Sequence, residues 1–419
     1  MHPLHRIPRR EFLTMAGAVL AFSPFAALAG AAEPAAPGCQ LRDGDTLALC
    51  GDSITSDGHY PSFLEAYQLL CGPRMNVTFV NCGRWGEIAA GFPKSWDKDF
   101  LPAKPTALTI CYGMNIGRGG KPLSAATLGE ESKALRAIID KFRAGGGRTV
   151  VVGSPGCVDT TFHPNPEGAN ASLAQLRDNA QKTAKETGAI FADVHTPMVA
   201  VMAKAKAKHG KEYAFAGGKG DGLHPGRAGH LVMAWAFLKA LGYDGQVGTL
   251  TVALDKGTAT ASEGHKVLGV RGGVVEVESA RYPFCFLGDP QRPKDFASAN
   301  SARSVVEFFP FNADLNRLTL VVQGAPAKQI KVTWGSEVKE LTPEALAKGV
   351  NLAAEFLDNP FTGPFGKITA ALSERNSCRK WLTQEAYKND ASIPKRLDAA
   401  LKALVPQPVK HEIKIEVVG

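Results

Sequence analysis

Residues 47–55, Leu-Ala-Leu-Cys-Gly-Asp-Ser-Ile-Thr, decide how the first half of this 419-residue chain can fold. A short apolar run of strand type ends in a Gly-Asp-Ser turn, and an amphipathic stretch with helical spacing follows at residues 60–70. This order of strand, turn and helix predicts that Ser53 lies at the carboxyl end of a strand, near a helix start. Ligands bind at that edge of an open parallel sheet, where unpaired backbone N–H groups can stabilise negative charge. Serine alone is a weak nucleophile, so a catalytic role for Ser53 requires a base and an oxyanion hole elsewhere in the chain.

Strand-like and helix-like stretches alternate from residue 46 to about residue 243. Apolar runs of strand type cover residues 47–50, 77–81, 107–112, 148–153 and 190–194. Helical spacing of apolar residues covers residues 60–70, 125–143, 172–187 and 229–241. Nearly continuous apolar strands with helical crossovers predict an α/β fold, in which a parallel sheet is covered by helices on both faces.

The pattern changes after Gly242, where β-type runs are separated by Gly, Pro, Asn and Asp. The runs cover residues 250–254, 266–270, 274–277, 304–309, 318–322 and 329–334. Those at 318–322 and 330–332 have the pattern of adjacent antiparallel strands. Helical pattern begins at Thr342-Pro343 and continues with breaks to about residue 404. Residues 409–417 alternate apolar and charged side chains, so we expect a half-buried strand that pairs within the same β-rich unit.

The length of the chain favours two domains over a single core. We expect an α/β domain over residues 39–244. A smaller β-rich accessory domain with a helical insertion is expected over residues 245–419, and its role would be to position or attach the substrate.

Residues 1–38 have the character of an export signal and linker rather than of a folded segment. Arg9-Arg10 precedes an apolar run over residues 15–28, a pattern of twin-arginine type, with small residues for cleavage at 27–29 or 29–31. A membrane anchor is the alternative interpretation, but the run is short and interrupted.

A lipid anchor at Cys39 is a further alternative, although residues 37–39 match a lipidation signal poorly. No other run in the sequence is long enough to span a bilayer. We therefore expect a periplasmic or extracellular protein with no stable membrane span after signal cleavage.

Composition narrows the function classes. The formal net charge is +8, and no Lys/Arg stripe is interleaved with aromatic residues, which disfavours a nucleic-acid partner.

Of the eight cysteines, Cys50, Cys82 and Cys111 each end an apolar run, so we expect buried thiols close together on adjacent strands rather than a disulfide framework. The sequence contains no Cys-x-x-Cys pairs and no His-Glu-x-x-His, and we expect neither a metal nor another cofactor.

Four short signals fall where the α/β region would bring them together. They are Gly51-Asp52-Ser53, the segment Asn81-Cys82-Gly83-Arg84-Trp85-Gly86, Gly113-Met114-Asn115, and Asp221-Gly222-Leu223-His224-Pro225. In this order, the set resembles the SGNH (GDSL-type) serine hydrolase superfamily over about residues 46–242. One position departs from the family pattern, since Ile116 follows Asn115 where the family often has Asp.

The resemblance implies a three-layer α/β/α domain and a role for each matched residue. Ser53 matches the nucleophile, His224 and Asp221 match the base and its orienting acid, and Gly86 and Asn115 match the oxyanion-hole residues. The backbone N–H of Ser53 would be the third oxyanion donor. Acyl transfer needs these three kinds of group, since a base must take the serine proton and donors must face the developing oxyanion.

Neighbouring residues have competing interpretations. Trp85, Arg84 and His59 are candidates for lining the substrate cleft, and surface or packing roles fit them equally well. His230 is a competing base, but we expect it inside the last helix of the α/β region. His195 fits a loop or capping residue better.

These observations favour an exported serine esterase without cofactor that acts on a small-molecule or polysaccharide ester. The preferred substrate reading is O-deacetylation of a carbohydrate. Hydrolysis of lipid, other acyl-ester or thioester substrates is the alternative, and a non-catalytic carbohydrate-binding scaffold is the alternative from another class. The oligomeric state stays open.

Overall fold

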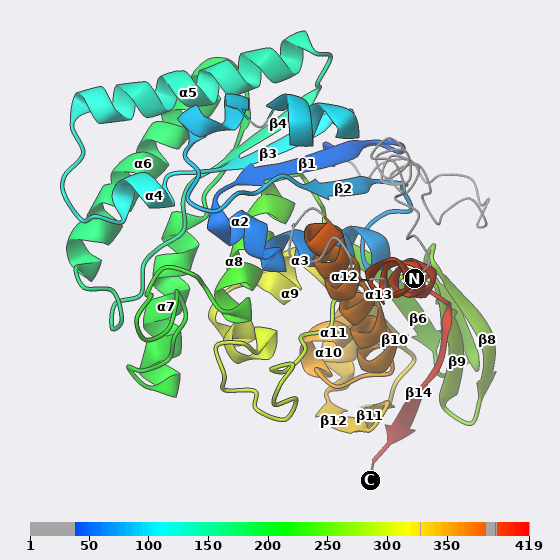
Figure 1. The fold of residues 1–419 in the computed structure, drawn as a ribbon. Helices are drawn as coiled ribbons and strands as arrows, with labels where there is room; N and C mark the ends of the chain where they lie inside the picture. Colours follow the sequence, from blue (N-terminus) through cyan, green and yellow to red (C-terminus); the bar gives the residue numbers. More distant parts are fainter. Residues whose placement is uncertain (1–37, 95, 327, 383–389, 391, 419) are drawn as a thin grey trace, which may run out of the picture.

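A computed structural model describes residues 38–94, 96–326, 328–382, 390 and 392–418 as an α/β part followed by two further β-sheets (Figure 1). The predicted twin-arginine pattern and both cleavage sites lie outside the described residues. Cys39 lies inside them, beside the last turn of the α/β part, where Gln40 N donates to Leu241 O at 2.8 Å. Among the described residues, no helix is both long and apolar enough to cross a bilayer.

The first sheet has five parallel strands in the order β2-β1-β3-β4-β5. The strands are β1 (Thr46–Gly51), β2 (Thr78–Asn81), β3 (Ala107–Cys111), β4 (Thr149–Gly153) and β5 (Ile190–Ala192). The α-helices of this part are α2 (Ser53–Asp57), α3 (His59–Leu70), α4 (Met114–Gly117), α5 (Ala125–Ala144), α6 (Pro166–Thr187), α7 (His195–His209) and α8 (Arg227–Ala240). The strand order reverses between β1 and β3, and ligands of such sheets bind outside the carboxyl ends of the strands at that point.

Helices cover both faces of this sheet, which confirms the predicted three-layer arrangement (Figure 1). On one face, Ile138 and Phe142 of α5 pack in the same core cluster as Ile110 of β3. On the other face, Tyr60 of α3 stacks on Phe237 of α8, with ring centroids 5.4 Å apart. The sheet is therefore buried on both faces, as its near-continuous apolar strands predict.

The second part contains two more sheets. One is mixed, with the order β13-β10-β6-β7, and the other is antiparallel, with the order β12-β11-β14-β9-β8. The strands are β6 (Gln246–Ala253), β7 (Thr258–Ala261), β8 (His265–Arg271), β9 (Val274–Ser279), β10 (Arg317–Gln323), β11 (Ile330–Trp334), β12 (Glu337–Leu341), β13 (Val350–Asn351) and β14 (Val409–Val417). The α-helices are α9 (Phe311–Leu315), α10 (Pro343–Lys348), α11 (Leu352–Glu355), α12 (Thr362–Leu382) and α13 (Ser392–Ala403).

Two expectations for this part are wrong. Residues 304–309 do not form a strand but lie mostly in a 3₁₀ helix, Ala302–Phe308, where Ser304 Oγ bonds to Ser301 O at 2.7 Å. Strands β10 and β11 are not adjacent, because β10 pairs in parallel with β6 while β11 belongs to the other sheet. The expected partners of β14 are confirmed, since it pairs with β11 and β9 of the second part.

Buried contacts join the two parts across residue 244. Tyr67 of α3 donates its hydroxyl hydrogen to Leu315 O at 2.7 Å, and Tyr282 N donates to Leu70 O at 2.7 Å. Arg375 of α12 forms a largely buried ion pair with Glu65 of α3. Helix α3 thus packs between the first sheet and the second part (Figure 1). A division into two domains at this boundary stays a prediction.

A buried polar chain crosses four neighbouring strands of the antiparallel sheet, β8, β9, β14 and β11. His265 Nδ1 lies 2.7 Å from Ser279 Oγ, which lies 3.0 Å from His411 Nε2. Trp334 Nε1 donates to His411 Nδ1 at 3.1 Å. Because an indole can only donate, His411 Nδ1 carries no proton, and the chain fits neutral imidazoles.

The cysteine prediction is confirmed in part. All eight cysteines lie among the described residues and none is paired in a disulfide. Cys50 and Cys82 share one core cluster and are close enough to interact. Cys111 packs in the other cluster, because it follows Ile110 on β3 and successive strand residues point to opposite faces. The three thiols are buried, but only two of them are neighbours.

Candidate active site

Ser53 is the first residue of α2 and directly follows the turn that ends β1. Asp52 caps this helix, since its Oδ1 accepts from Ile54 N at 3.0 Å. Burial raises the pKa of Asp52 to about 7. The Ser53 side chain is only 7% exposed. The short turn therefore fixes where the hydroxyl points, and Asp52 acts as a helix cap rather than as a partner of a histidine.

One hydrogen-bonded chain joins Ser53, His224 and Asp221. His224 Nε2 lies 2.7 Å from Ser53 Oγ, and His224 Nδ1 lies 3.0 Å from Asp221 Oδ2. A carboxylate can only accept, so the Nδ1 proton belongs to the imidazole and Nε2 is left to accept from the serine hydroxyl. This is the geometry in which an imidazole can remove the serine proton.

Two residues without any sequence signal hold the loop that carries Asp221. The buried Asp159, in the loop after β4, forms an ion pair with Lys206 of α7 at 2.8 Å. Asp159 Oδ2 also accepts from Ala216 N at 3.3 Å, and Asp159 N donates to Gly222 O at 2.9 Å. The loop is thereby fastened on both sides of Asp221. Helix α7 itself was not expected from the sequence.

The loop after β2 is pressed against the helix that carries the nucleophile. Arg84 N donates to Gly51 O at 2.9 Å. A Cβ atom on Gly83 would lie 2.4 Å from Ser56 N, so only glycine allows this approach. The close contact brings the following residues, Trp85 and Gly86, to the edge of the sheet where Ser53 lies.

Asn115 lies close to Gly86 because it forms a hydrogen bond with Glu87, the residue after Gly86. Gly86 is exposed and has a φ of +70°. Asn115, at the start of α4, donates its side-chain amide to Glu87 O at 3.0 Å. The structure therefore places Asn115 beside the Gly86–Glu87 segment, and the oxyanion-hole roles of both residues stay a prediction.

The three candidates for the cleft occupy different positions. The Trp85 ring is 63% exposed and its centroid lies 5.5 Å from that of His224, so it borders the candidate triad. His59 is the first residue of α3, and its ring centroid lies 5.1 Å from that of His230. Burial and the nearby Arg227 guanidinium lower the pKa of His59 to about 4. Arg84 is partly exposed at the start of the Trp85 loop.

The competing histidines are engaged elsewhere. His230 is fully buried in α8, and its Nδ1 accepts from Tyr60 N at 3.3 Å. Burial lowers the pKa of His230 well below the usual value. His195 begins α7, and its Nδ1 lies 2.8 Å from Gly156 O. Among these three histidines, His224 is the one whose hydrogen bond reaches Ser53. Among the described residues, no group of three or more His, Cys, Asp or Glu side chains is placed to hold a metal ion.

A loop from the second part supports the segment just after His224. Ala228 N, in the first turn of α8, donates to Ala299 O at 3.0 Å. A Cβ atom on Gly226 would lie 2.5 Å from the same oxygen. Residues 287–301, which we call the bracing loop, thus press on the start of α8 two residues after His224. The sequence carries no signal of this contact.

Comparison with known proteins gives consistent results. Residues 49–232 match the model of the GDSL-like lipase/acylhydrolase family. An acetylxylan esterase of Geobacillus stearothermophilus is 21% identical over 225 residues, which make up 49% of this chain and 97% of that protein. All four sequence signals lie within residues 49–232.

Two of the solved structures that resemble this chain differ in how much of it they cover. The structure of a gut microbial diltiazem-metabolizing enzyme covers 91% of this chain and 100% of its own, at 20% identity and a TM-score of 0.70. An acetyl-xylooligosaccharide esterase of Geobacillus covers 49% of this chain and 97% of its own, at 21% identity and a TM-score of 0.40. The diltiazem-metabolizing enzyme thus shares the fold of this chain over both the α/β part and the additional sheets.

Proposed function

Because residues 49–232 belong to the GDSL-like lipase/acylhydrolase family, we propose that this protein is a serine esterase with Ser53 as its nucleophile. The observation that carries the proposal is the hydrogen-bonded chain from Ser53 Oγ through the His224 ring to Asp221, with links of 2.7 and 3.0 Å. An unassisted serine hydroxyl is a weak nucleophile, and this chain supplies the base that it needs.

The reaction follows from the roles of these groups. His224 Nε2 takes the hydroxyl proton as Ser53 Oγ attacks the ester carbonyl, and the charge of Asp221 stabilises the imidazolium that forms. The Ser53 and Gly86 N–H groups and the Asn115 side-chain amide donate to the oxyanion. The imidazolium then protonates the leaving alcohol, and a water molecule activated by His224 hydrolyses the acyl-serine. Loss of one oxyanion donor typically costs about 3 kcal/mol of transition-state stabilisation.

For the substrate, we propose an acetyl ester of a carbohydrate outside the cytoplasm. Two observations and one prediction support this choice. The relative from Geobacillus stearothermophilus is an acetylxylan esterase, and the exposed Trp85 ring beside His224 offers an apolar face to a sugar. The export signal predicted from the sequence would bring the protein to where polysaccharides occur.

The test is a rate measurement with p-nitrophenyl acetate and with acetylated oligosaccharides. We expect turnover of both, loss of at least about 10³-fold in kcat for Ser53→Ala, and unchanged secondary structure in that variant. Esters with long acyl chains should be turned over more slowly than the acetyl esters. Faster turnover of the long-chain esters would favour a lipid substrate, and no turnover of any ester would favour a non-catalytic binding protein.

A further inference from the structure

Arg227 is a partly buried cation without a hydrogen-bond partner, close in sequence to the candidate catalytic base. It begins α8, three residues after His224, and its Nε atom is buried without any hydrogen-bond acceptor. Among the described residues, no hydrogen bond or ion pair reaches its guanidinium, which instead lies over the Phe63 ring at 5.2 Å. Buried arginines are ordinarily paired, because an uncompensated charge is costly away from water.

The surroundings of Arg227 increase this cost rather than relieve it. Its neighbours include His59 and His230, which offer no negative charge. Burial lowers the pKa of Arg227 below the usual value, and Asp289 offsets this effect only in part. Arg227 is the first residue of α8, and its charge acts on His59, the first residue of α3, which directly follows the short helix that begins at Ser53. Arg227 as a whole is only partly buried, so part of the residue is accessible from solvent.

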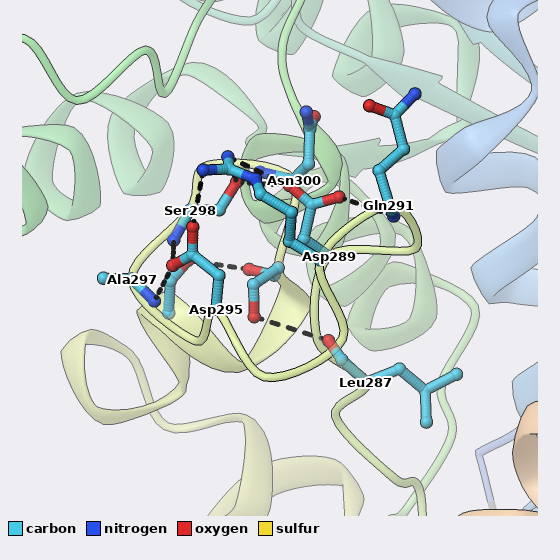
Figure 2. A network of polar contacts seen from close by, with 10 residues as sticks. Leu287, Asp289, Gln291, Asp295, Ala297, Ser298 and Asn300 are labelled. Atoms are coloured by element: carbon cyan, nitrogen blue, oxygen red, sulfur yellow. Dashed lines mark hydrogen bonds and ion pairs between the residues drawn. The ribbon is translucent and has the colours of Figure 1, made fainter.

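The nearest carboxylate is already occupied by its own loop. Asp289 belongs to the bracing loop and is only 3% exposed. Its oxygens accept from Ser298 Oγ at 2.7 Å and from Gln291 N at 2.9 Å, and an ion pair of 3.5 Å joins it to Arg292 (Figure 2). The Ser298 hydroxyl is the main cause that holds the pKa of Asp289 below the usual value. Asp289 therefore attracts Arg227 from a distance but does not pair with it.

We propose that Arg227 binds an anionic group of the substrate, and that this group is a carboxylate on the sugar that carries the acetyl ester. The proposal rests on the esterase function proposed above. Since an acetyl group cannot bear a second acid, the anion must belong to the alcohol part of the ester. A planar guanidinium matches a carboxylate with two parallel hydrogen bonds, which a lysine could not supply. The substrate class is then an O-acetylated acidic glycan that contains uronic-acid units.

The experiment compares two substrates that differ only in charge. One is a mono-O-acetylated methyl glucuronoside, and the other is the glucuronamide with the acetyl group on the same hydroxyl. We expect wild-type kcat/KM to be about 10- to 100-fold higher for the acid, which corresponds to one charge-assisted contact. The preference should decline as ionic strength rises, because salt screens the partly exposed charge.

Variants assign this preference to one side chain. Arg227→Gln removes the charge and should bring the acid-to-amide ratio close to one, while Arg227→Lys should retain a part of it. Arg271→Gln is the control, because it removes an equal charge from an exposed site at the end of β8, and it should keep the wild-type ratio. Should Arg227→Gln fail to fold, Arg227→Lys carries the assignment, because a lysine cannot supply the two parallel hydrogen bonds, and an unchanged acid-to-amide ratio in that variant would refute the role of Arg227.

The outcomes separate this inference from the function on which it rests. If the wild type turns over both sugars equally, the carboxylate site is refuted while the esterase function stands. If Arg227→Gln keeps the preference, another residue binds the anion and the inference is wrong. A preference for p-nitrophenyl hemisuccinate over p-nitrophenyl acetate would place the anion on the acyl side and also overturn it. If no ester at all is hydrolysed, the esterase proposal itself fails.

Discussion

The contact between the bracing loop and the start of α8 predicts a strong effect for Gly226→Ala. Gly226 has φ −70° and ψ 177°, a conformation that alanine adopts freely, so the substitution adds a methyl group without straining the backbone. That methyl carbon would lie 2.5 Å from Ala299 O, whereas close C···O contacts are about 3.3 Å, so the two segments must separate by about 0.8 Å. Both partners are backbone, and neither can rotate out of the way.

The magnitude follows from this displacement. His224 lies two residues before Gly226, and a misplacement of about 1 Å at a catalytic group can cost about 10²-fold in rate. Overpacking of this kind also destabilises by about 1–3 kcal/mol. We therefore expect Gly226→Ala to lower kcat for p-nitrophenyl acetate by one to two orders of magnitude, with a small change in KM and a lower Tm.

The assay needs a second glycine as its control. Gly129→Ala in α5 is suitable, because a Cβ atom there would meet no other atom within 4 Å. This variant should keep wild-type kcat and gain up to about 1 kcal/mol of stability from the higher helix propensity of alanine. Wild-type kcat together with an unchanged Tm for Gly226→Ala would refute the reasoning that the second part of the chain positions the catalytic base.

Three further predictions concern stability. The pKa of Asp52 is about 7 in the folded state, whereas the unfolded chain releases this proton near pH 4. The Asp52 carboxyl therefore lowers the free energy of unfolding as pH rises from about 4 to 7. In urea denaturation, Asp52→Asn should be more stable than the wild type by a few kcal/mol at pH 8, but not at pH 4. Burial lowers the pKa of His411 to about 4, so the free energy of unfolding should fall as pH drops from about 6.5 toward 4. His411→Gln should flatten this decline. If the variant declines as steeply as the wild type, His411 is not the cause. Truncation after Tyr243 removes the partners of Tyr67 and Glu65, so we expect the remaining α/β part to lose cooperative unfolding and esterase activity, and a folded, active fragment would contradict this expectation.

The parts of the molecule that could be predicted from the sequence are those that depend on residues close together in the chain. The nucleophile turn and the Asp221–His224 loop are short, and each follows a strand or precedes a helix whose periodicity is clear. Helix α7 escaped detection because alanine and lysine alternate over residues 203–208, which hides the helical period although both residues favour helices. The strand expected at residues 304–309 is a helix for a tertiary reason, since Tyr213 of the α/β part bonds to Ser304 at 2.5 Å.

Other features depend on contacts that no local pattern encodes. The salt bridge of Asp159 with Lys206 and the contact of Ala299 with α8 join residues more than 40 positions apart. Strands β10 and β11 have the alternation of a hairpin, yet β10 pairs with β6, which precedes it by about 70 residues, and β11 pairs with β14 near the end of the chain. Periodicity predicts that a strand exists and which face is buried, but it does not choose the neighbour.

The position of β14 has a consequence for how the protein is made. This strand comes after all four other strands of its sheet in the sequence, yet it lies in the middle of the sheet, between β11 and β9. During synthesis, β9 and β11 therefore leave the ribosome with open edges and wait for a strand that has not yet been translated. Open strand edges invite pairing with other chains. The sheet can close only after residues 409–417 have emerged, so the nascent chain depends on protection from aggregation until translation has passed that point.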